Sequence, residues 1–452
     1  MELDMTKGSP FKLIMKFMVP LIIGNIFQQL YNMADTIIVG RYVGTGALAA
    51  VGSTGTIMFL IIGFMQGMTT GFTILTSQRF GSGDIEGLKK SVGNAAVLSI
   101  IVTVIGTFIS VAGMDGLLKL MNTPPDIFQD AKDYITIICI GLVANILYNL
   151  LASILRAVGN SKVPLYFLVV AAILNVVLDL VFIIQFKMGV SGAAWATVIS
   201  QGVSGVLCLI YIMKKVSILH IGKEDWKLDY YCVRNQLSIG IPMAVQFSIT
   251  AIGTILVQSA LNILGSVAVA AYTAAGKVEQ FVTQPFLALG MTMATYCAQN
   301  TGINDIKRIR AGVLIANIMS AIYGVVIAFV VVFAMPHAIK LFIVDDAAMI
   351  TEYAKTYIGI TSVFFIPLGM IFIFRNVLQG CGYSFVPIMG GIVELASRAV
   401  LAVLAASLMS FTGVCFANAA AWITAGLYLW ISYLYTMRKW ERKQTIFQDN
   451  TV

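Results

Sequence analysis

Long apolar segments recur along the whole chain, and each is long enough to cross a lipid bilayer as a helix. The hydrocarbon core of a bilayer is about 30 Å thick, and one helical crossing takes about 20 apolar residues. Apolar runs between Gly, Pro and charged residues predict twelve crossings. They cover residues 13–38, 47–77, 91–118, 132–157, 163–186, 190–213, 237–262, 267–298, 310–335, 354–380, 385–410 and 412–437. Only 11% of the residues are charged, against about 25% in soluble domains. We therefore expect an all-α polytopic membrane protein and exclude a soluble globule.

The basic residues indicate how the crossings are oriented. In a soluble protein a net charge of +8 would suggest nucleic-acid binding, but in membrane proteins Lys and Arg gather in cytoplasmic loops. With both termini placed inside, 20 of the 29 Lys and Arg residues fall in inside loops and tails, six fall outside and three lie within crossings. We therefore predict a multi-pass protein of the cell membrane, with both termini cytoplasmic and no nucleic-acid partner.

The two halves of the chain repeat one another. The segment LRAVGNSKVP at 155–164 returns as LQGCGYSFVP at 378–387, and the loop at 78–85 returns at 299–306, which are offsets of 223 and 221 residues. A duplicated unit with six crossings keeps its orientation, so the copies form a parallel repeat with pseudo-two-fold symmetry. We predict two six-helix bundles: an N-lobe at 1–214 and a C-lobe at 237–452, joined by a cytoplasmic linker at 215–236.

Four acidic residues lie inside predicted crossings, where an ionised carboxylate needs a cavity, a partner or a proton. They are Asp35, Asp179, Glu279 and Glu394. Asn175 shares a helix face with Asp179 through their i, i+4 spacing. Both aspartates are specific to the first half, because their repeat positions are apolar. If they converge, they could hold one proton between them, or bind a sodium ion as metal ligands together with Asn175.

Asp35 ends a polar stripe on one face of the first crossing. The stripe comprises Asn25, Gln28, Gln29, Asn32 and Asp35. Polar contacts between helices are the alternative interpretation, but they do not require a carboxylate, so we favour an ion or proton site that opens on a cavity. Thr197 in the sixth crossing could add a hydroxyl ligand, although membrane threonines often bond to their own helix.

The second half contains a different set of charges. Glu394 and Arg398 have i, i+4 spacing, which favours a neutralised buried pair. Glu279 has no such local partner and could contact a cation or carry a proton. The candidates for a substrate cavity are Gln28, Asn32, Gln246, Glu279, Met291 and Arg375.

What the sequence lacks excludes several chemistries. There is no G-x-x-x-x-G-K-[ST] phosphate-binding loop, so an ATP-driven pump would need a separate ATPase. The two histidines cannot form a catalytic or metal cluster, and the six cysteines include no C-x-x-C pair, which favours buried thiols. We expect no enzyme activity and no cofactor other than a coupling ion, H⁺ or Na⁺.

Taken together, four segments resemble the multidrug and toxic compound extrusion (MATE) family. They are PLIIGNIFQQLYNMADTIIVGRYVG at 20–44, LRAVGNSKVP with LNVVLDLVFI at 174–183, GVSGAAWATVI at 189–199 and QNTGINDIKRIR at 299–310. The resemblance implies a twelve-helix, two-lobed antiporter that exports organic cations and amphipathic drugs, driven by a proton or sodium gradient. It also implies a cation site in the N-lobe at Asp35, Asn175, Asp179, Thr197 and Tyr134.

One departure from the family pattern concerns the C-lobe. Some members have a Glu in the seventh crossing and an Asp in the tenth, where this chain has Thr250 and Leu368. The chain is therefore more similar to the bacterial branch that lacks this second cation site.

We predict a secondary active antiporter that works by alternating access as a functional monomer among membrane lipids. A flippase for a lipid-linked or amphiphilic substrate is the alternative, although a pyrophosphate would need a larger cationic cavity than three intramembrane basic residues provide. A channel or receptor is disfavoured by the duplicated bundles and by acids that are specific to one lobe.

Overall fold

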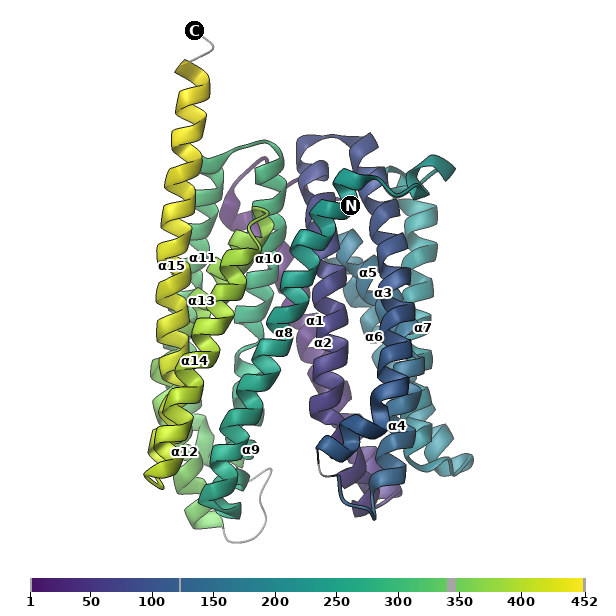
Figure 1. Cartoon of the computed structure of the whole chain (residues 1–452), viewed down its shortest axis with the longest axis vertical. Coiled ribbons are helices and arrows are strands. Elements are labelled where there is room, and N and C mark those ends of the chain that lie inside the picture. The colour runs from purple at the N-terminus through teal and green to yellow at the C-terminus, as the bar shows by residue number, and fades with distance from the viewer. Residues whose placement is uncertain (1, 122, 340–346, 450–452) are drawn as a thin grey trace. The chain divides into compact units, whose positions relative to one another are not determined.

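The computed structural model describes residues 2–121, 123–339 and 347–449, and within these ranges every regular element is a helix (Figure 1). The α-helices are α1 (Pro10–Tyr42), α2 (Thr45–Ser82), α3 (Ile85–Leu120), α4 (Phe128–Ile140), α5 (Leu142–Ala157), α6 (Lys162–Leu180), α7 (Gly189–Lys215), α8 (Tyr230–Leu264), α9 (Ser266–Val282), α10 (Gln284–Gly302), α11 (Ile306–Ile339), α12 (Ala347–Val363), α13 (Phe365–Gly380), α14 (Phe385–Ser407) and α15 (Phe411–Asp449). A π-helical turn, η1 (Val181–Gln185), extends α6, and two 3₁₀ turns, η2 (Ser217–Leu219) and η3 (Lys223–Trp226), lie between α7 and α8.

The predicted crossings correspond to these helices, and the all-α polytopic fold is confirmed. Among the described residues, nine helices are long and apolar enough to cross a membrane, and two bent pairs raise the number to eleven. The α4–α5 pair bends by 46° and the α12–α13 pair by 53°. The remaining predicted crossing, at 267–298, is divided at Thr283 into α9 and α10. The apolar pattern predicts none of these three breaks.

Each break has a local cause. At Gly141, between α4 and α5, a Cβ atom would lie 2.2 Å from Cγ2 of Val198, so α7 passes too close for any larger residue. Pro285 and Pro367 lie in the first turns of α10 and α13. Because proline has no N–H group and clashes with the preceding turn, it ends the previous helix and is tolerated at the start of the next one.

Left-handed backbone positions recur along the chain at the spacing of the predicted repeat. The φ angles are +123° at Gly44 and +98° at Gly265, +74° at Gly83 and +59° at Asn304, +84° at Gly159 and +86° at Gly382, and +53° at Lys187 and +52° at Met409. The members of each pair are 221 to 223 residues apart. Two of these positions carry Lys and Met, for which a left-handed conformation is strained. The duplication therefore preserves backbone turns even where the residue type has changed.

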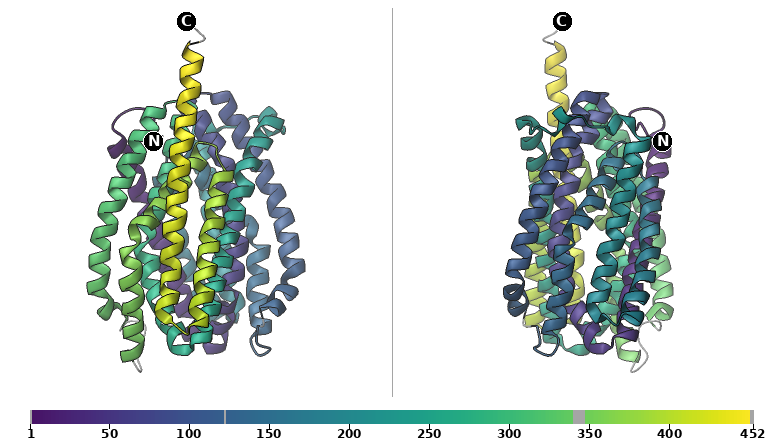
Figure 2. Two further views of the ribbon diagram at one scale, coloured as in Figure 1. Left: turned by 60° about the vertical axis from the view of Figure 1, so that its left-hand side comes forward. Right: turned by 90° about the vertical axis from the view of Figure 1, so that its right-hand side faces the viewer.

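The contacts divide the chain into two compact units. Unit 1 comprises Met1–Asp4 and Val19–Ser248, and unit 2 comprises Met5–Met18 and Ile249–Val452, so α1 and α8 each contribute to both. In unit 1, α2 packs on α3 and α5, and α7 packs on α5 and α6. In unit 2, α14 packs along α15, as Figure 2 shows in green and yellow, and α13 packs on α10. The lobe limits 1–214 and 237–452 stay a prediction.

Glycines of α2 allow very close helix packing inside unit 1. A Cβ atom at Gly71 would lie 2.4 Å from Cα of Gly240 in α8, and one at Gly67 would lie 2.7 Å from Cα of Ala244. Small residues allow membrane helices to associate through direct backbone contact, since there is no hydrophobic driving force between helices in lipid.

The start of unit 2 is fixed by main-chain hydrogen bonds. The carbonyl oxygen of Met5 accepts from Nε and Nη2 of Arg308 at 3.0 and 2.9 Å, and the Met5 N–H donates to Oε1 of Gln299 at 2.8 Å. Met5 itself is fully buried. A charged guanidinium that donates twice to one carbonyl holds this segment in a defined position.

Candidate functional site

Two aspartates of unit 1 come together although 144 residues separate them in the sequence. Asp35 lies on α1, and Asp179 lies at the end of α6, directly before the π-helical turn η1. Their carboxyl groups lie near enough to interact with each other, and a hydrogen bond between them would need one of them to carry a proton. Asp35 is half-buried and Asp179 is fully buried. The pair is therefore suited to bind a proton.

Several buried oxygen atoms at this site accept no hydrogen bond from the described residues. Oδ1 of Asp35, both carboxylate oxygens of Asp179 and Oδ1 of Asn175 are buried, and no N–H group or hydroxyl of the described residues donates to them. Buried polar atoms in proteins are normally paired, so four free oxygens point to a cation that they would bind. Carboxylate and amide oxygens are also suitable ligands for a small hard cation.

The other predicted members of the cation site are neighbours of this pair. Nδ2 of Asn175 donates to Oγ1 of Thr197 at 3.4 Å, which turns its amide oxygen away from α7. Tyr134 of α4 is 3% exposed and lies near both aspartates. The structure thus brings together all five residues proposed for the cation site.

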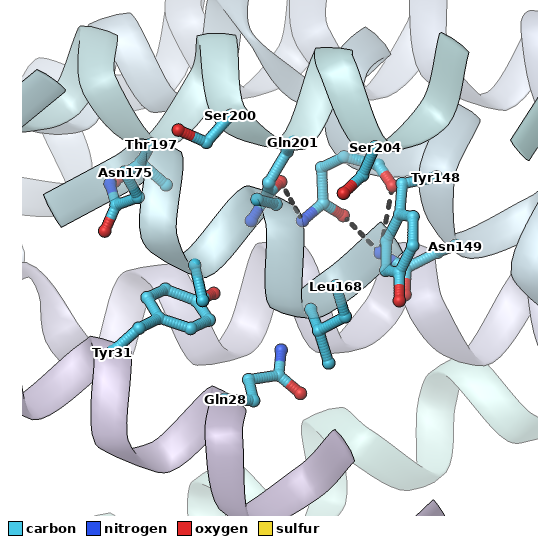
Figure 3. A pocket seen from close by; sticks show the side chains of 13 residues that line it. Gln28, Tyr31, Tyr148, Asn149, Leu168, Asn175, Thr197, Ser200, Gln201 and Ser204 are labelled. Carbon is cyan, nitrogen blue, oxygen red and sulfur yellow. Dashed lines mark hydrogen bonds between the residues drawn. The ribbon is translucent and has the colours of Figure 1, made fainter. Parts of the chain in front are cut away.

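A polar pocket adjoins the cation site within unit 1 (Figure 3). Its lining includes no charged side chain. Its lining residues are Gln28, Tyr31, Asn145, Tyr148, Asn149, Leu168, Ala171, Ala172, Asn175, Thr197, Ser200, Gln201 and Ser204. Because Asn175 and Thr197 belong to both the pocket and the cation site, a ligand in the pocket touches groups that also surround the carboxylates.

Hydrogen bonds hold one wall of this pocket in place. Nδ2 of Asn145 donates to Oε1 of Gln201 at 2.8 Å, and Nδ2 of Asn149 donates to Oδ1 of Asn145 at 3.0 Å (Figure 3). The hydroxyl of Ser204 donates to the carbonyl of Phe167 at 2.8 Å. The wall is therefore a fixed set of amide groups on α5 and α7.

Sequence reasoning missed most of this wall, although the signal was present. Thr197, Gln201 and Ser204 are spaced by four and three residues, and Asn145 and Asn149 by four, so each set follows one helical face. These polar residues lie within otherwise apolar helices, where a polar face is unusual and indicates a polar cavity or a polar partner.

The predicted cavity candidates are distributed over both units. Gln28 lines the pocket of unit 1, and Asn32, one turn later on α1, is exposed. Gln246 on α8 and Met291 on α10 are half-buried. None of these placements tests a role in substrate binding, so that role stays a prediction.

Glu279 has a partner that the sequence did not indicate. The hydroxyl of Tyr357 on α12 donates to Oε2 of Glu279 on α9. Nδ2 of Asn418 on α15 donates to the hydroxyls of Tyr272 at 2.9 Å and of Tyr357 at 3.3 Å. The two tyrosine rings are in edge contact, with centroids 4.6 Å apart. Glu279 therefore belongs to a carboxyl-phenol cluster.

The predicted pair of Glu394 and Arg398 is confirmed, and Arg375 joins it. Nη2 of Arg398 donates to Oε1 of Glu394, and Nη2 of Arg375 donates to Oε2, both at 2.7 Å. Arg375 is therefore bonded to a carboxylate of the protein through Nη2. The three side chains are only 7 to 10% exposed.

Other binding chemistries find no support in the described ranges. No three His, Cys, Asp or Glu side chains of the described residues form a metal-binding group. All six cysteines are buried and free, as predicted.

Known proteins match most of the chain. The MatE family model matches twice, at residues 20–181 and 242–404. The chain is 28% identical over 385 residues to "Probable multidrug resistance protein YpnP" of Bacillus subtilis, with 84% of each chain covered, and 28% identical over 355 residues to "Probable multidrug resistance protein YoeA" of the same organism, with 76% of each covered. A solved structure of a MOP superfamily transporter from Pyrococcus furiosus superposes with a TM-score of 0.92 at 22% identity, covering 97% of this chain and 98% of that one.

Proposed function

The chain belongs to the MatE family, and from this premise we propose that it is a secondary antiporter that exports organic cations and amphipathic drugs in exchange for protons or sodium ions. Relatives that match over most of its length are described as multidrug resistance or multidrug export proteins. These are transport proteins, so the expectation of no enzyme activity is confirmed. We place the protein in the cell membrane with both termini cytoplasmic.

The observation that carries the proposal is the pair of carboxylates beside the pocket of unit 1. Asp35 and Asp179 have buried oxygens without a donor, and Asn175 and Thr197 connect them to the pocket. A cation bound to the carboxylates and a drug in the pocket therefore act on the same side chains. If the cation weakens drug binding, the drug must weaken cation binding by the same factor.

This coupling gives a transport cycle by alternating access. In the outward-facing state Asp35 and Asp179 take up H⁺ or Na⁺, and the drug leaves because its affinity falls. After reorientation the cation is released to the cytosol and a new drug molecule binds. The pocket suits amphipathic drugs, because amide and hydroxyl groups alternate with the rings of Tyr31 and Tyr148 and with apolar Leu168.

The test is transport of rhodamine 123, a fluorescent cation, into everted membrane vesicles under separately imposed proton and sodium gradients. Asp35→Asn and Asp179→Asn remove one ionisable oxygen each while keeping the side-chain volume. We expect each variant to lose at least tenfold in gradient-driven uptake, because the cation can no longer be bound and released.

The matched control is Asp115→Asn. Asp115 of α3 is 53% exposed and pairs with Lys132 at 2.8 Å, outside the proposed site. Uptake by this variant should equal that of the unmodified protein. Near-normal uptake by both Asp35→Asn and Asp179→Asn would refute the assignment of the site, and no gradient-driven uptake by the unmodified protein would refute the antiport proposal.

A further inference from the structure

Two arginines share one glutamate inside unit 2. Arg375 of α13 and Arg398 of α14 both bind Glu394, each through a single Nη2 atom at 2.7 Å. One arginine would neutralise Glu394, so the triad carries a formal charge of +1 at membrane depth. A net charge at that depth is costly unless something compensates it.

Glu279, another buried acid of unit 2, does not provide this compensation through an ion pair. Glu279 acts electrostatically on Arg398, but its hydrogen bond comes from the phenol of Tyr357. In the described part of the chain, the salt bridges of Arg375 and Arg398 are those to Glu394. The excess positive charge thus has no bonded counter-ion.

Both guanidinium groups also retain unused donors. Nε of Arg375 and Nε of Arg398 are buried, and no atom of the described residues accepts from them. An arginine normally satisfies such donors in a planar, bidentate contact with a carboxylate or phosphate. The free Nε–H groups and the excess charge therefore call for the same kind of partner, an anionic group.

The guanidinium of Arg398 packs against the backbone of α8 in unit 2. A Cβ atom at Gly253 of α8 would lie 2.4 Å from Nη1 of Arg398, so the guanidinium occupies the space beside this glycine. This packing holds the donors of Arg398 in a defined direction, which selective binding requires.

We infer that the Arg375–Glu394–Arg398 triad is a recognition site for a carboxylate on an amphipathic substrate. The inference rests on the proposed function and extends it, because zwitterionic substrates then bind as well as simple cations. The carboxylate receives the free Nε–H donors, while Glu394 keeps the two arginines apart and in place.

A pair of dyes tests this directly. Rhodamine 110 has a carboxylate, and rhodamine 123 is its methyl ester, so the two differ only at the group that the triad would recognise. Binding of each dye to the full-length protein in lipid nanodiscs is measured by fluorescence anisotropy. This readout needs no ion gradient, so it is separate from the test of antiport.

Arg398→Gln should weaken rhodamine 110 binding about tenfold, which is the lower end of what one hydrogen bond to a charged group contributes. Binding of rhodamine 123 should stay unchanged or tighten, because a positive charge is removed. Glu394→Gln should act in the opposite direction and tighten rhodamine 110, because it removes the negative charge beside the two arginines while the Gln oxygen can still accept a hydrogen bond from them. Arg398→Lys keeps the positive charge but loses the planar, bidentate guanidinium. Its affinity for rhodamine 110 should lie between that of the unmodified protein and that of Arg398→Gln.

Several results would overturn the inference. They are an equal loss of both dyes in Arg398→Gln, no change for either dye, failure of the unmodified protein to bind rhodamine 110, or weaker rhodamine 110 binding in Glu394→Gln. Retained rhodamine 123 binding shows that each variant is folded. If the dyes bind with the expected selectivity but vesicles show no gradient-driven transport, the antiport proposal fails and the triad assignment stands.

Discussion

Replacing Gly71 by alanine should destabilise unit 1 through one added methyl group. The new Cβ would lie 2.4 Å from Cα and 2.7 Å from N of Gly240, whereas non-bonded carbon atoms prefer about 3.5–4.0 Å. The contact atoms are backbone, so α2 and α8 must separate by about 1 Å or more. Overpacking of this kind costs about 1–3 kcal/mol.

The control for this prediction is Gly55→Ala on the same helix. No atom lies within 4 Å of the position of its added Cβ, so it changes helix propensity by the same amount, up to about 1 kcal/mol in favour of alanine, without a clash. The difference between the two variants therefore isolates the steric cost at the contact between α2 and α8.

Thermal unfolding can be followed with a dye that fluoresces when it reacts with thiols, because all six cysteines are buried and free in the folded chain. For a cooperative unit of 150–250 residues, about 1 kcal/mol shifts Tm by roughly 2–4 °C. Gly71→Ala should therefore unfold at least a few degrees below Gly55→Ala. Equal Tm values for the two variants would show that the helices are not held at backbone contact.

Three further outcomes are expected. Arg308→Lys should speed hydrogen exchange at the amide of Met5 by at least tenfold in mass spectrometry, since lysine cannot donate twice to one carbonyl, and unchanged exchange would contradict the role of the guanidinium. Asp84→Ala should cost about 1 kcal/mol, because its carboxylate caps α3 by accepting a main-chain N–H at 2.8 Å; a Tm equal to that of the unmodified protein would argue against the cap. The N–H of Cys232 lowers the pKa of Asp229, so the stability that Asp229 contributes is present at neutral pH and lost on acidification through its folded-state pKa. The Tm difference from Asp229→Ala should therefore narrow below about pH 4, and a difference that widens there would contradict this sign.

The sequence is sufficient to predict the helices because one crossing leaves a long apolar run. It also identifies the residues of the proposed cation site, since a carboxylate inside an apolar run is unusual. Asp35 and Asp179 each show this signal, but only the fold brings them together. The breaks at Gly141 and Thr283 escape prediction because apolar periodicity continues through a bend. Bends depend on what packs alongside, such as Val198 at Gly141.

The charges of unit 2 show the same limit. The spacing of Glu394 and Arg398 predicts their contact, because i and i+4 always lie on one helical face. The bond from Arg375, which lies on another helix, has no such local signal. The hydrogen bond from Tyr357 to Glu279 has no local signal either, because the two residues are 78 positions apart in the sequence. Local pairs can therefore be derived from the sequence, whereas partners on neighbouring helices need the three-dimensional arrangement.

The recurring left-handed turns bear on the history of the chain. Lys187 and Met409 keep φ angles of +53° and +52° although one is charged and the other apolar. Neither Asp35 nor Asp179 has an acidic counterpart in the other copy. The two copies therefore share their backbone turns but differ in the helix interiors between them. The two halves of the chain have thus become specialised. Because their turns share one backbone conformation, these turns are suitable junctions for grafting a helix from one half into the other.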